Sequence, residues 1–162
     1  MSNQILPENG VVSYTTTVKP EWLDLNNHMN VAYYTMTFDL ALDALHHVIG
    51  LTHEYIERER RSTVALEAHI TYQQEASLGD ELRVDTRVID SDGKKAHYYQ
   101  EMYRGEQLLA THETLSISFD TDARRSCLFD ETFAERHRQM AEAQRKLPTP
   151  SWIGRKVGIR RK

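Results

Sequence analysis

The feature that most limits the fold of this chain is a change in hydrophobic period. From residue 31 onward, apolar residues recur at helical spacing, which predicts a helix over 31–49. Asn30 suits its N-cap and Gly50 its end. The apolar stripe of this predicted helix consists of Val31, Tyr34, Phe38, Ala41, Leu45 and Val48.

After residue 62 the period changes to two, which is typical of half-buried strands. Because the links between these strands are short, we expect an antiparallel meander, with a hairpin turn at 91–94. A β-branched run at 11–19 predicts one further strand ahead of the helix. The strands expected in the meander cover residues 63–73, 82–88, 95–104 and about 107–119.

The C-terminal part follows a different pattern. Residues 130–146 are rich in Ala, Glu, Arg and Gln without Gly or Pro, which predicts a second helix. The tail at 147–162 carries five basic residues and no acid, and forms either an ordered arm or a frayed end. The length predicts one domain over 1–162, with the C-terminal helix and basic tail starting at about 130.

These elements together predict an α+β fold, with a five- to six-stranded antiparallel sheet wrapped around the long helix. One helix cannot cover both faces of such a sheet, so its other face needs a partner. A homodimer or homotetramer is the simplest arrangement that supplies one.

Composition excludes several classes of function. The net charge of −4 disfavours nucleic-acid binding, and no apolar run approaches the ~20 residues of a membrane span. The start of the chain lacks the features of a signal peptide, and the single cysteine, Cys127, fits a reducing, cytoplasmic setting. The histidines form no metal-binding pattern, and no Gly-rich phosphate loop is present, so we expect no metal and no cofactor.

The stretch 18–34, VKPEWLDLNNHMNVAYY, carries the most informative motif. This stretch resembles the corresponding motif of the hotdog-fold thioesterases of the 4-hydroxybenzoyl-CoA thioesterase group. The resemblance rests on an acid, a short turn, the run 28–30 and a tyrosine on the following helix. Matching residues 28–30 and Tyr34 puts the catalytic aspartate of that family on Asp24. The resemblance implies a hotdog fold and the hydrolysis of a small acyl-CoA thioester.

A narrower resemblance, to the betainyl-CoA thioesterases of carnitine breakdown, covers roughly residues 12–128. It implies hydrolysis of betainyl-CoA to betaine and CoA. The positions that carry it are 20–22, 28–34, 100–103, 109–111, Glu113 and 124–126.

The motif departs from the family pattern at three positions. Trp22 stands where an acid is common, Asn27 replaces the motif glycine, and Val31 replaces its second asparagine. Asparagine tolerates the left-handed backbone almost as glycine does, so we expect the turn to be preserved. We expect the tryptophan at position 22 to affect which class of substrate is accepted more than how the thioester is cleaved.

The residues themselves also suit an acyl-transfer site. The first N–H groups of the predicted helix, near Val31 and Ala32, are suited to hold a developing oxyanion. Asp24 lies on a tight turn seven residues upstream, and would attack the thioester or activate water. The alternative is that Asp24 only caps the turn.

His28 and Asn27 complete the predicted catalytic set. His28 acts as a general acid or orders the loop by hydrogen bonding, and Asn27 shapes the turn and positions water. An Asp–His pair also resembles the hotdog hydratases, although these separate the two residues by five with Asn-Pro between them. Here the separation is four and no proline intervenes.

The quaternary ammonium of betaine would be held by aromatic faces and carboxylates. Trp22 beside the loop is the first candidate; Tyr34 and Tyr99 are others, although strand tyrosines commonly lie in cores or interfaces. Glu67 is a secondary acidic candidate, or else a partner in an ion pair. The predicted substrate-binding set is therefore Trp22, Val31, Tyr34, Glu67 and Tyr99.

Two other functions remain open. One is a thioesterase for another short, aromatic or carrier-protein-bound acyl group. The other is a non-catalytic hotdog module that binds a quaternary ammonium or CoA ligand. In every case the expected partner is a small molecule, with CoA phosphates held by scattered basic groups such as Arg58 or Arg124.

Overall fold

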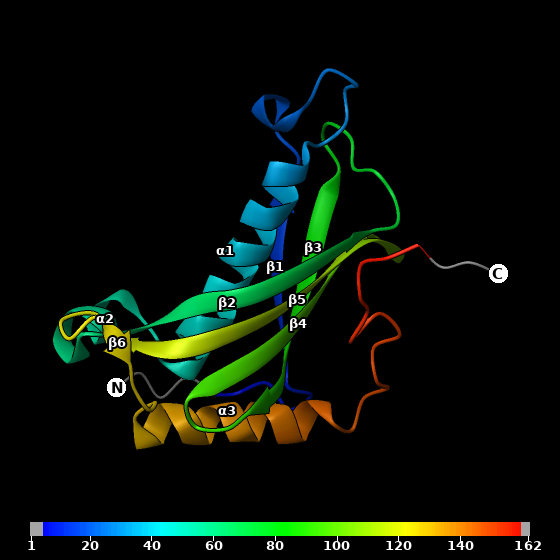
Figure 1. Ribbon diagram of the computed structural model, residues 1–162. Helices are drawn as coiled ribbons and strands as arrows, with labels where there is room; N and C mark the ends of the chain where they lie inside the picture. Colours follow the sequence, from blue (N-terminus) through cyan, green and yellow to red (C-terminus); the bar gives the residue numbers. More distant parts are fainter. Residues whose placement is uncertain (1–4, 160–162) are drawn as a thin grey trace.

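A curved sheet wrapped around one long helix dominates the computed structural model, which describes residues 5–159 (Figure 1). The predicted α+β hotdog fold is confirmed. The strands are β1 (Val11–Thr17), β2 (Arg61–Tyr72), β3 (Glu81–Ser91), β4 (Lys95–Arg104), β5 (Gln107–Asp120) and β6 (Arg125–Ser126). The helices are a 3-10 turn η1 (Pro20–Trp22), α1 (Val31–Ile49), α2 (His53–Glu59) and α3 (Glu131–Gln144).

The order of strands in the antiparallel sheet is β1-β3-β4-β5-β2, with β6 paired to the end of β5. Strands β3, β4 and β5 form the expected meander, but the prediction that β2 continues it is wrong. β2 instead pairs with β5, on the side of the meander away from β3, and Ile70 lies opposite His112 in the strand register. The link at 73–80 is not a tight hairpin turn but an eight-residue segment, long enough to carry the chain across to β3.

The central helix α1 begins and ends where the sequence predicted. The side chain of Asn30 accepts a hydrogen bond from the Ala32 N–H at 3.0 Å. Gly50 ends the helix with φ 102°, a left-handed backbone that glycine adopts without a steric penalty. Phe38, Ala41 and Leu45 are fully buried against the inner face of the sheet, as the apolar stripe required.

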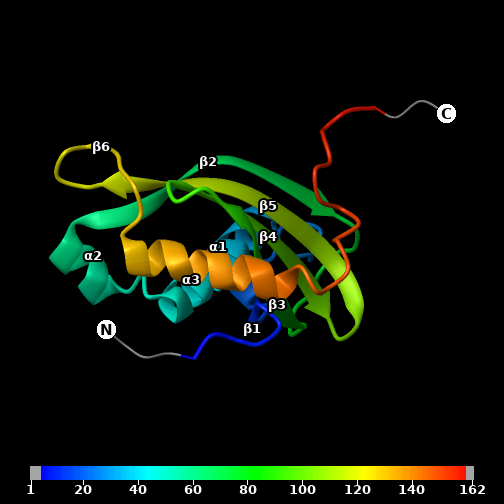
Figure 2. The ribbon, with the colours of Figure 1, turned by 90° about the horizontal axis from the view of Figure 1, so that it is seen from below.

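Helix α3 closes one end of this core. Figure 2 shows it lying across the end of the curved sheet, beside α1. Phe133 and Met140 of α3 join Leu45 of α1 and Tyr98 of β4 in one buried cluster. The polar segment after α1, for which the sequence suggested a turn of helix or a flap, forms the short helix α2.

The C-terminal tail crosses the outer face of the sheet. The Pro148 carbonyl accepts a hydrogen bond from Arg87 at 3.2 Å, and the Gly154 N–H donates to Glu113 at 2.8 Å. The described part of the tail therefore forms an ordered arm; the predicted basic residues at 160–162 lie outside the described residues. Each helix within residues 5–159 is too short or too polar to span a lipid bilayer.

Candidate active site

A five-residue hairpin turn presents the predicted catalytic aspartate. The Asp24 N–H donates to the His28 carbonyl at 2.9 Å, and the Asn27 N–H donates to the Asp24 carbonyl at 3.1 Å. Asn27 has φ 60°, in the left-handed region, so it performs the backbone role of the motif glycine, as expected. The turn brings Asp24, Asn27 and His28 together just ahead of α1.

The two carboxylate oxygens of Asp24 have different surroundings. Its Oδ1 accepts hydrogen bonds from the backbone N–H groups of Asn26, at 2.7 Å, and His28, at 3.3 Å. Asp24 therefore does cap the turn, as the alternative interpretation held. Its Oδ2 has no hydrogen-bond partner among residues 5–159, so one oxygen of the carboxylate stays available for chemistry.

The hairpin rests on the segment that links β2 to β3. The Met29 N–H donates to the Ala76 carbonyl at 2.8 Å, and His28 forms a β-bridge with Ser77. The Ala76 N–H in turn donates to the hydroxyl of Tyr34 at 2.9 Å. Tyr34 is buried, and burial raises the pKa of its phenol, which favours the neutral form. Tyr34 thus supports the platform beneath the hairpin.

Fewer backbone N–H groups are open in the first turn of α1 than the sequence suggested. The Ala32 N–H is occupied by the Asn30 side chain, and the Tyr33 N–H bonds to the Asn30 carbonyl at 2.9 Å. The Val31 N–H finds no acceptor among the described residues, and this residue is 60 % exposed. Asp24 and Asn30 line the same surface depression, which places the carboxylate close to the positive end of the helix.

His28 does not bond to the Asp24 carboxylate through its ring. Its Nε2 lies 3.3 Å from Oε1 of Glu75, and both side chains reach solvent. Sequence reasoning missed Glu75, because it belongs to the distant segment before β3 and no local motif marks it. The turn therefore holds His28 through its backbone and Glu75 engages its side chain.

The aromatic residues near the hairpin form a stack. Trp22 is buried, with only 5 % of its surface exposed, and its ring lies 5.4 Å from that of Tyr33 at an angle of 12°. The ammonium of Lys19 lies 5.6 Å from the Trp22 ring centroid. A cation thus already occupies the aromatic surface that the sequence assigned to a quaternary ammonium.

Two of the predicted substrate-binding residues lie elsewhere in the chain. Glu67 lines a separate hollow of about 480 Å³ on the outer face, beside His97 and Glu113. Tyr99 is buried on that same face, and burial, followed by the nearby Glu101 carboxylate, raises the pKa of its phenol. Within one chain, the fold does not bring these two residues to the Asp24 hairpin. No group of three potential metal ligands occurs among residues 5–159.

The fold and the hairpin define the class of protein to which the chain belongs. The sequence model of the thioesterase-like superfamily matches residues 18–137, from the start of the motif to the middle of α3. The chain belongs to this superfamily, and the predicted class of enzyme, a hotdog-fold thioesterase, is confirmed.

Individual relatives narrow the comparison. The betainyl-CoA thioesterase of Pseudomonas aeruginosa is 33 % identical over 151 residues, which cover 92 % of this chain and 95 % of that protein. The Staphylococcus aureus protein SAV2348, solved in complex with CoA, is 29 % identical with a TM-score of 0.87, covering 93 % of this chain and 96 % of that one. A candidate thioesterase of Pseudomonas putida KT2440 is 32 % identical with a TM-score of 0.79, covering 91 % and 96 %.

Proposed function

We propose that this chain hydrolyses betainyl-CoA to betaine and CoA. One observation carries the chemistry: an open carboxylate oxygen of Asp24 shares a surface depression with the N-cap of α1, next to the open Val31 N–H. The full-length similarity to a betainyl-CoA thioesterase supports the choice of acyl group. The CoA complex of a similar structure supports a CoA thioester over a carrier-protein substrate.

In this proposal, Asp24 supplies the carboxylate and α1 stabilises the charge that develops. The free Oδ2 attacks the thioester carbonyl, the C–S bond breaks to release the CoA thiolate, and water hydrolyses the resulting anhydride to betaine and free Asp24. Alternatively, Oδ2 takes a proton from a water that attacks the carbonyl and displaces the CoA thiolate. The Val31 N–H and the positive end of the helix stabilise the resulting oxyanion. Asn27 positions the water, and His28 orders the turn and acts as the general acid that protonates the departing CoA thiolate.

The trimethylammonium group would displace the Lys19 ammonium from the Trp22 ring, because two like charges cannot share one aromatic face. Lys19 sits over the Trp22 ring, and Tyr33 extends the same aromatic stack toward solvent. A quaternary ammonium cannot donate hydrogen bonds, so an aromatic face is a suitable site for it. Glu75, close to His28, adds a carboxylate of the right charge.

We also propose that the chain acts as a homodimer formed through β2. This 12-residue strand pairs with β5 on one side, and its other edge pairs with no strand among residues 5–159. An uncovered edge of this length is a template for another strand. The apolar side chains exposed along β2 and the adjacent face of α1 are Val64, Leu66, Tyr72, Val31, Met36 and Leu40.

An isologous β2–β2 pairing would bury this apolar surface and place residues of one chain beside the site of the other. Glu67 lies on β2, so it remains a candidate to reach the partner's substrate, and Tyr99 remains a predicted contact.

We further propose a cytoplasmic location, because the single cysteine suits a reducing compartment and excludes an internal disulfide.

A substrate pair that differs only in charge tests the proposed acyl group. Betainyl-CoA and 3,3-dimethylbutyryl-CoA have the same shape, but the second has carbon in place of the cationic nitrogen. We expect kcat/KM to be at least tenfold higher for betainyl-CoA, measured by trapping the released thiol. Equal rates would reject the quaternary ammonium site but keep the thioesterase. Release from neither substrate, nor from other short or aromatic acyl-CoAs, would favour a non-catalytic binding module.

A further inference from the structure

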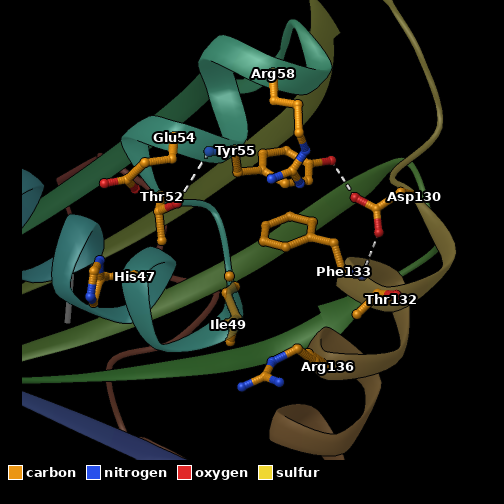
Figure 3. Close-up of a pocket in the computed structure, with 11 residues that line it drawn as sticks. His47, Ile49, Thr52, Glu54, Tyr55, Arg58, Asp130, Thr132, Phe133 and Arg136 are labelled. Carbon is orange, nitrogen blue, oxygen red and sulfur yellow. Dashed lines mark hydrogen bonds between the residues drawn. The ribbon is translucent and has the colours of Figure 1, made fainter. Parts of the chain in front are cut away.

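Two cavities beside α1 differ in whether their charged groups are paired. Figure 3 shows the first, which lies between α1, α2 and α3. Its Asp130 accepts hydrogen bonds from the Tyr55 hydroxyl and the Phe133 N–H, and its Arg58 pairs with Glu59 at 2.6 Å. The second cavity lies between α1 and β2, with a volume of about 160 Å³. In this second cavity the charges are not balanced.

Small side chains on three neighbouring strands leave room for the second cavity. Ala65 of β2 lies opposite Ser116 of β5 in the strand register, and Ser116 lies opposite Ala96 of β4. Residues that lie opposite each other on adjacent strands point to the same face of a sheet. The sheet is therefore shallow at this point, where α1 crosses it, and a gap remains between the helix and the strands.

Two carboxylates of α1 stand at the rim of this cavity. Asp39 and Asp43 are four residues apart, so they lie on the same side of the helix. Neither pairs with a lysine or an arginine among residues 5–159, and no lysine or arginine lines the cavity. Burial, followed by the charge of Asp43, raises the pKa of the Asp39 carboxyl. The rim thus carries negative charge that no neighbouring lysine or arginine balances.

A buried chain of hydrogen bonds orients His46 in the wall of the cavity. Nδ1 of His137 donates to the Phe133 carbonyl at 3.0 Å, and burial lowers the pKa of His137 to about 4, so its ring is neutral. Its Nε2 therefore accepts the Tyr98 hydroxyl proton at 2.8 Å. The Tyr98 oxygen in turn accepts from Nε2 of His46 at 3.3 Å. This order leaves Nδ1 of a neutral His46 as an acceptor.

The polar groups around the cavity lack a donor. Nδ1 of His46 lies 3.9 Å from Oδ1 of Asp43, too far for a direct hydrogen bond. One nitrogen with two N–H groups would bridge both atoms at about 2.9 Å from each. Ser116 also lines the cavity and is only 2 % exposed, yet its hydroxyl forms no hydrogen bond within residues 5–159. Buried polar groups normally have a partner, so these groups indicate a bound donor.

We propose that this cavity binds a small primary ammonium ion, such as methylammonium. Its N–H groups bridge His46 and Asp43 and reach the Ser116 hydroxyl, while Asp39 supplies a second negative charge. A quaternary ammonium has no N–H group to donate, so it would leave these acceptors without partners.

The size and the remaining lining of the cavity limit the ligand further. Small-molecule sites commonly measure about 300–1,000 Å³, so a cavity of about 160 Å³ admits only a short hydrocarbon part. Leu42, Leu51 and Ile56 supply the apolar surface for it. No group of three potential metal ligands occurs within residues 5–159, which disfavours a metal ion. None of these residues belongs to the Asp24 hairpin, so the site is separate from the proposed hydrolysis.

Thermal unfolding in methylammonium chloride, with sodium chloride at the same concentration as the match for ionic strength, tests this site. A ligand that binds only the folded chain raises Tm, and we expect a rise of about 2 °C over sodium at about 50 mM. The dependence of Tm on concentration gives the affinity. Asp39→Asn and Asp43→Asn should each weaken it about fivefold, and Ser116→Ala about threefold.

The matched control is Glu57→Gln. Glu57 is an acid of α2 that pairs with His53 outside the cavity, so its loss should leave the affinity unchanged. Asp39 and Asp43 are exposed at the rim, so their asparagine variants should fold. Equal Tm values in methylammonium and sodium, an affinity unchanged in both asparagine variants, or an equal loss in Glu57→Gln would overturn the proposal.

The Asp24→Asn variant separates this cavity from the catalytic hairpin, which also carries negative charge. An unchanged methylammonium affinity in that variant would support the separate site. Loss of the effect in Asp24→Asn would place the cation at the hairpin and overturn the proposal.

Discussion

At the level of individual residues, the Asp24 carboxylate combines a structural and a chemical task. Its Oδ1 holds the turn through the N–H groups of Asn26 and His28, and its Oδ2 is open. Asparagine at this position preserves the accepting Oδ1 but removes the charge and the nucleophile. Alanine removes both, so two substitutions separate the two tasks.

The turn-holding task predicts a difference in stability between these variants. Asp24→Ala should lower the free energy of unfolding by about 1 kcal/mol, because two backbone donors lose their acceptor. Asp24→Asn should stay within about 0.5 kcal/mol of the wild type. Urea unfolding followed by circular dichroism measures both. Equal stability of the alanine and asparagine variants would show that the Oδ1 contacts do not hold the turn.

Two buried histidines predict how stability depends on pH. Burial lowers the pKa of His112 and of His137 to about 4, from an ordinary value of 6.5. Between these values the unfolded chain binds more protons than the folded one, so stability falls as pH falls from about 6.5 to 4. The loss is on the order of 3 kcal/mol for each histidine, and urea midpoints at several pH values would reveal it. A urea midpoint that stays constant from pH 7 to 4.5 would contradict this prediction. The control is His53→Gln, which replaces an exposed histidine and should leave the dependence of the midpoint on pH unchanged.

Among the structural elements, the segment at 73–80 has the largest effect on the site. It carries the chain from the edge strand β2 to the interior strand β3, and it bonds to the hairpin on the way. Asp80 holds it through the Ser77 N–H at 2.8 Å and through an ion pair with Arg104. Tyr34 bonds to the same segment from α1, so the helix, the segment and the hairpin form one hydrogen-bonded unit.

This unit predicts a positioning role for Tyr34. Tyr34→Phe removes the hydroxyl that accepts the Ala76 N–H, so the hairpin loses part of its support. We expect kcat to fall about tenfold with KM within twofold, since a small misplacement of catalytic groups costs rate rather than binding. The control is Tyr103→Phe, which removes a hydroxyl bond of 2.9 Å on the outer face. Equal effects of both variants would mean that Tyr34 only stabilises the fold.

The sequence predicted elements well where local physics decides them. The helix 31–49 was exact because its apolar period, its cap at Asn30 and its end at Gly50 all agree. The position of β2 was wrong because strand pairing depends on contacts between distant residues, which alternation alone does not encode. The Asp24 turn was predictable because it is formed by residues that are close together in the sequence. Glu75 and the partners of Tyr34 were not predictable because they belong to a distant segment.

For the molecule as a unit, the uncovered edge of β2 is the feature that most needs a partner. In the proposed dimer, β2 of a second copy of the chain covers this edge and the apolar residues beside it. The outer face of the sheet, by contrast, is already crossed by the C-terminal arm. The expected dimer therefore forms edge to edge.

The proposed dimer predicts the effect of a charge on its edge. Leu66 is 53 % exposed on β2, and Leu66→Lys would bury an unpaired charge in the interface. We expect this variant to be a monomer at concentrations where the wild type is a dimer, as measured by light scattering after size-exclusion chromatography. Leu128→Lys, at a leucine that is 66 % exposed but lies outside the strand edge, should remain dimeric. A dimeric Leu66→Lys protein would place the interface elsewhere.

The most direct test of the account is thiol release from betainyl-CoA by the wild type and by Asp24→Asn, side by side. Asparagine keeps the turn, so the fold and dimer should be unchanged while kcat falls by about 10²–10⁴-fold. That result would assign the chemistry to the free oxygen of Asp24. A folded Asp24→Asn enzyme with wild-type turnover would contradict the account, because the carboxylate would then serve only the turn.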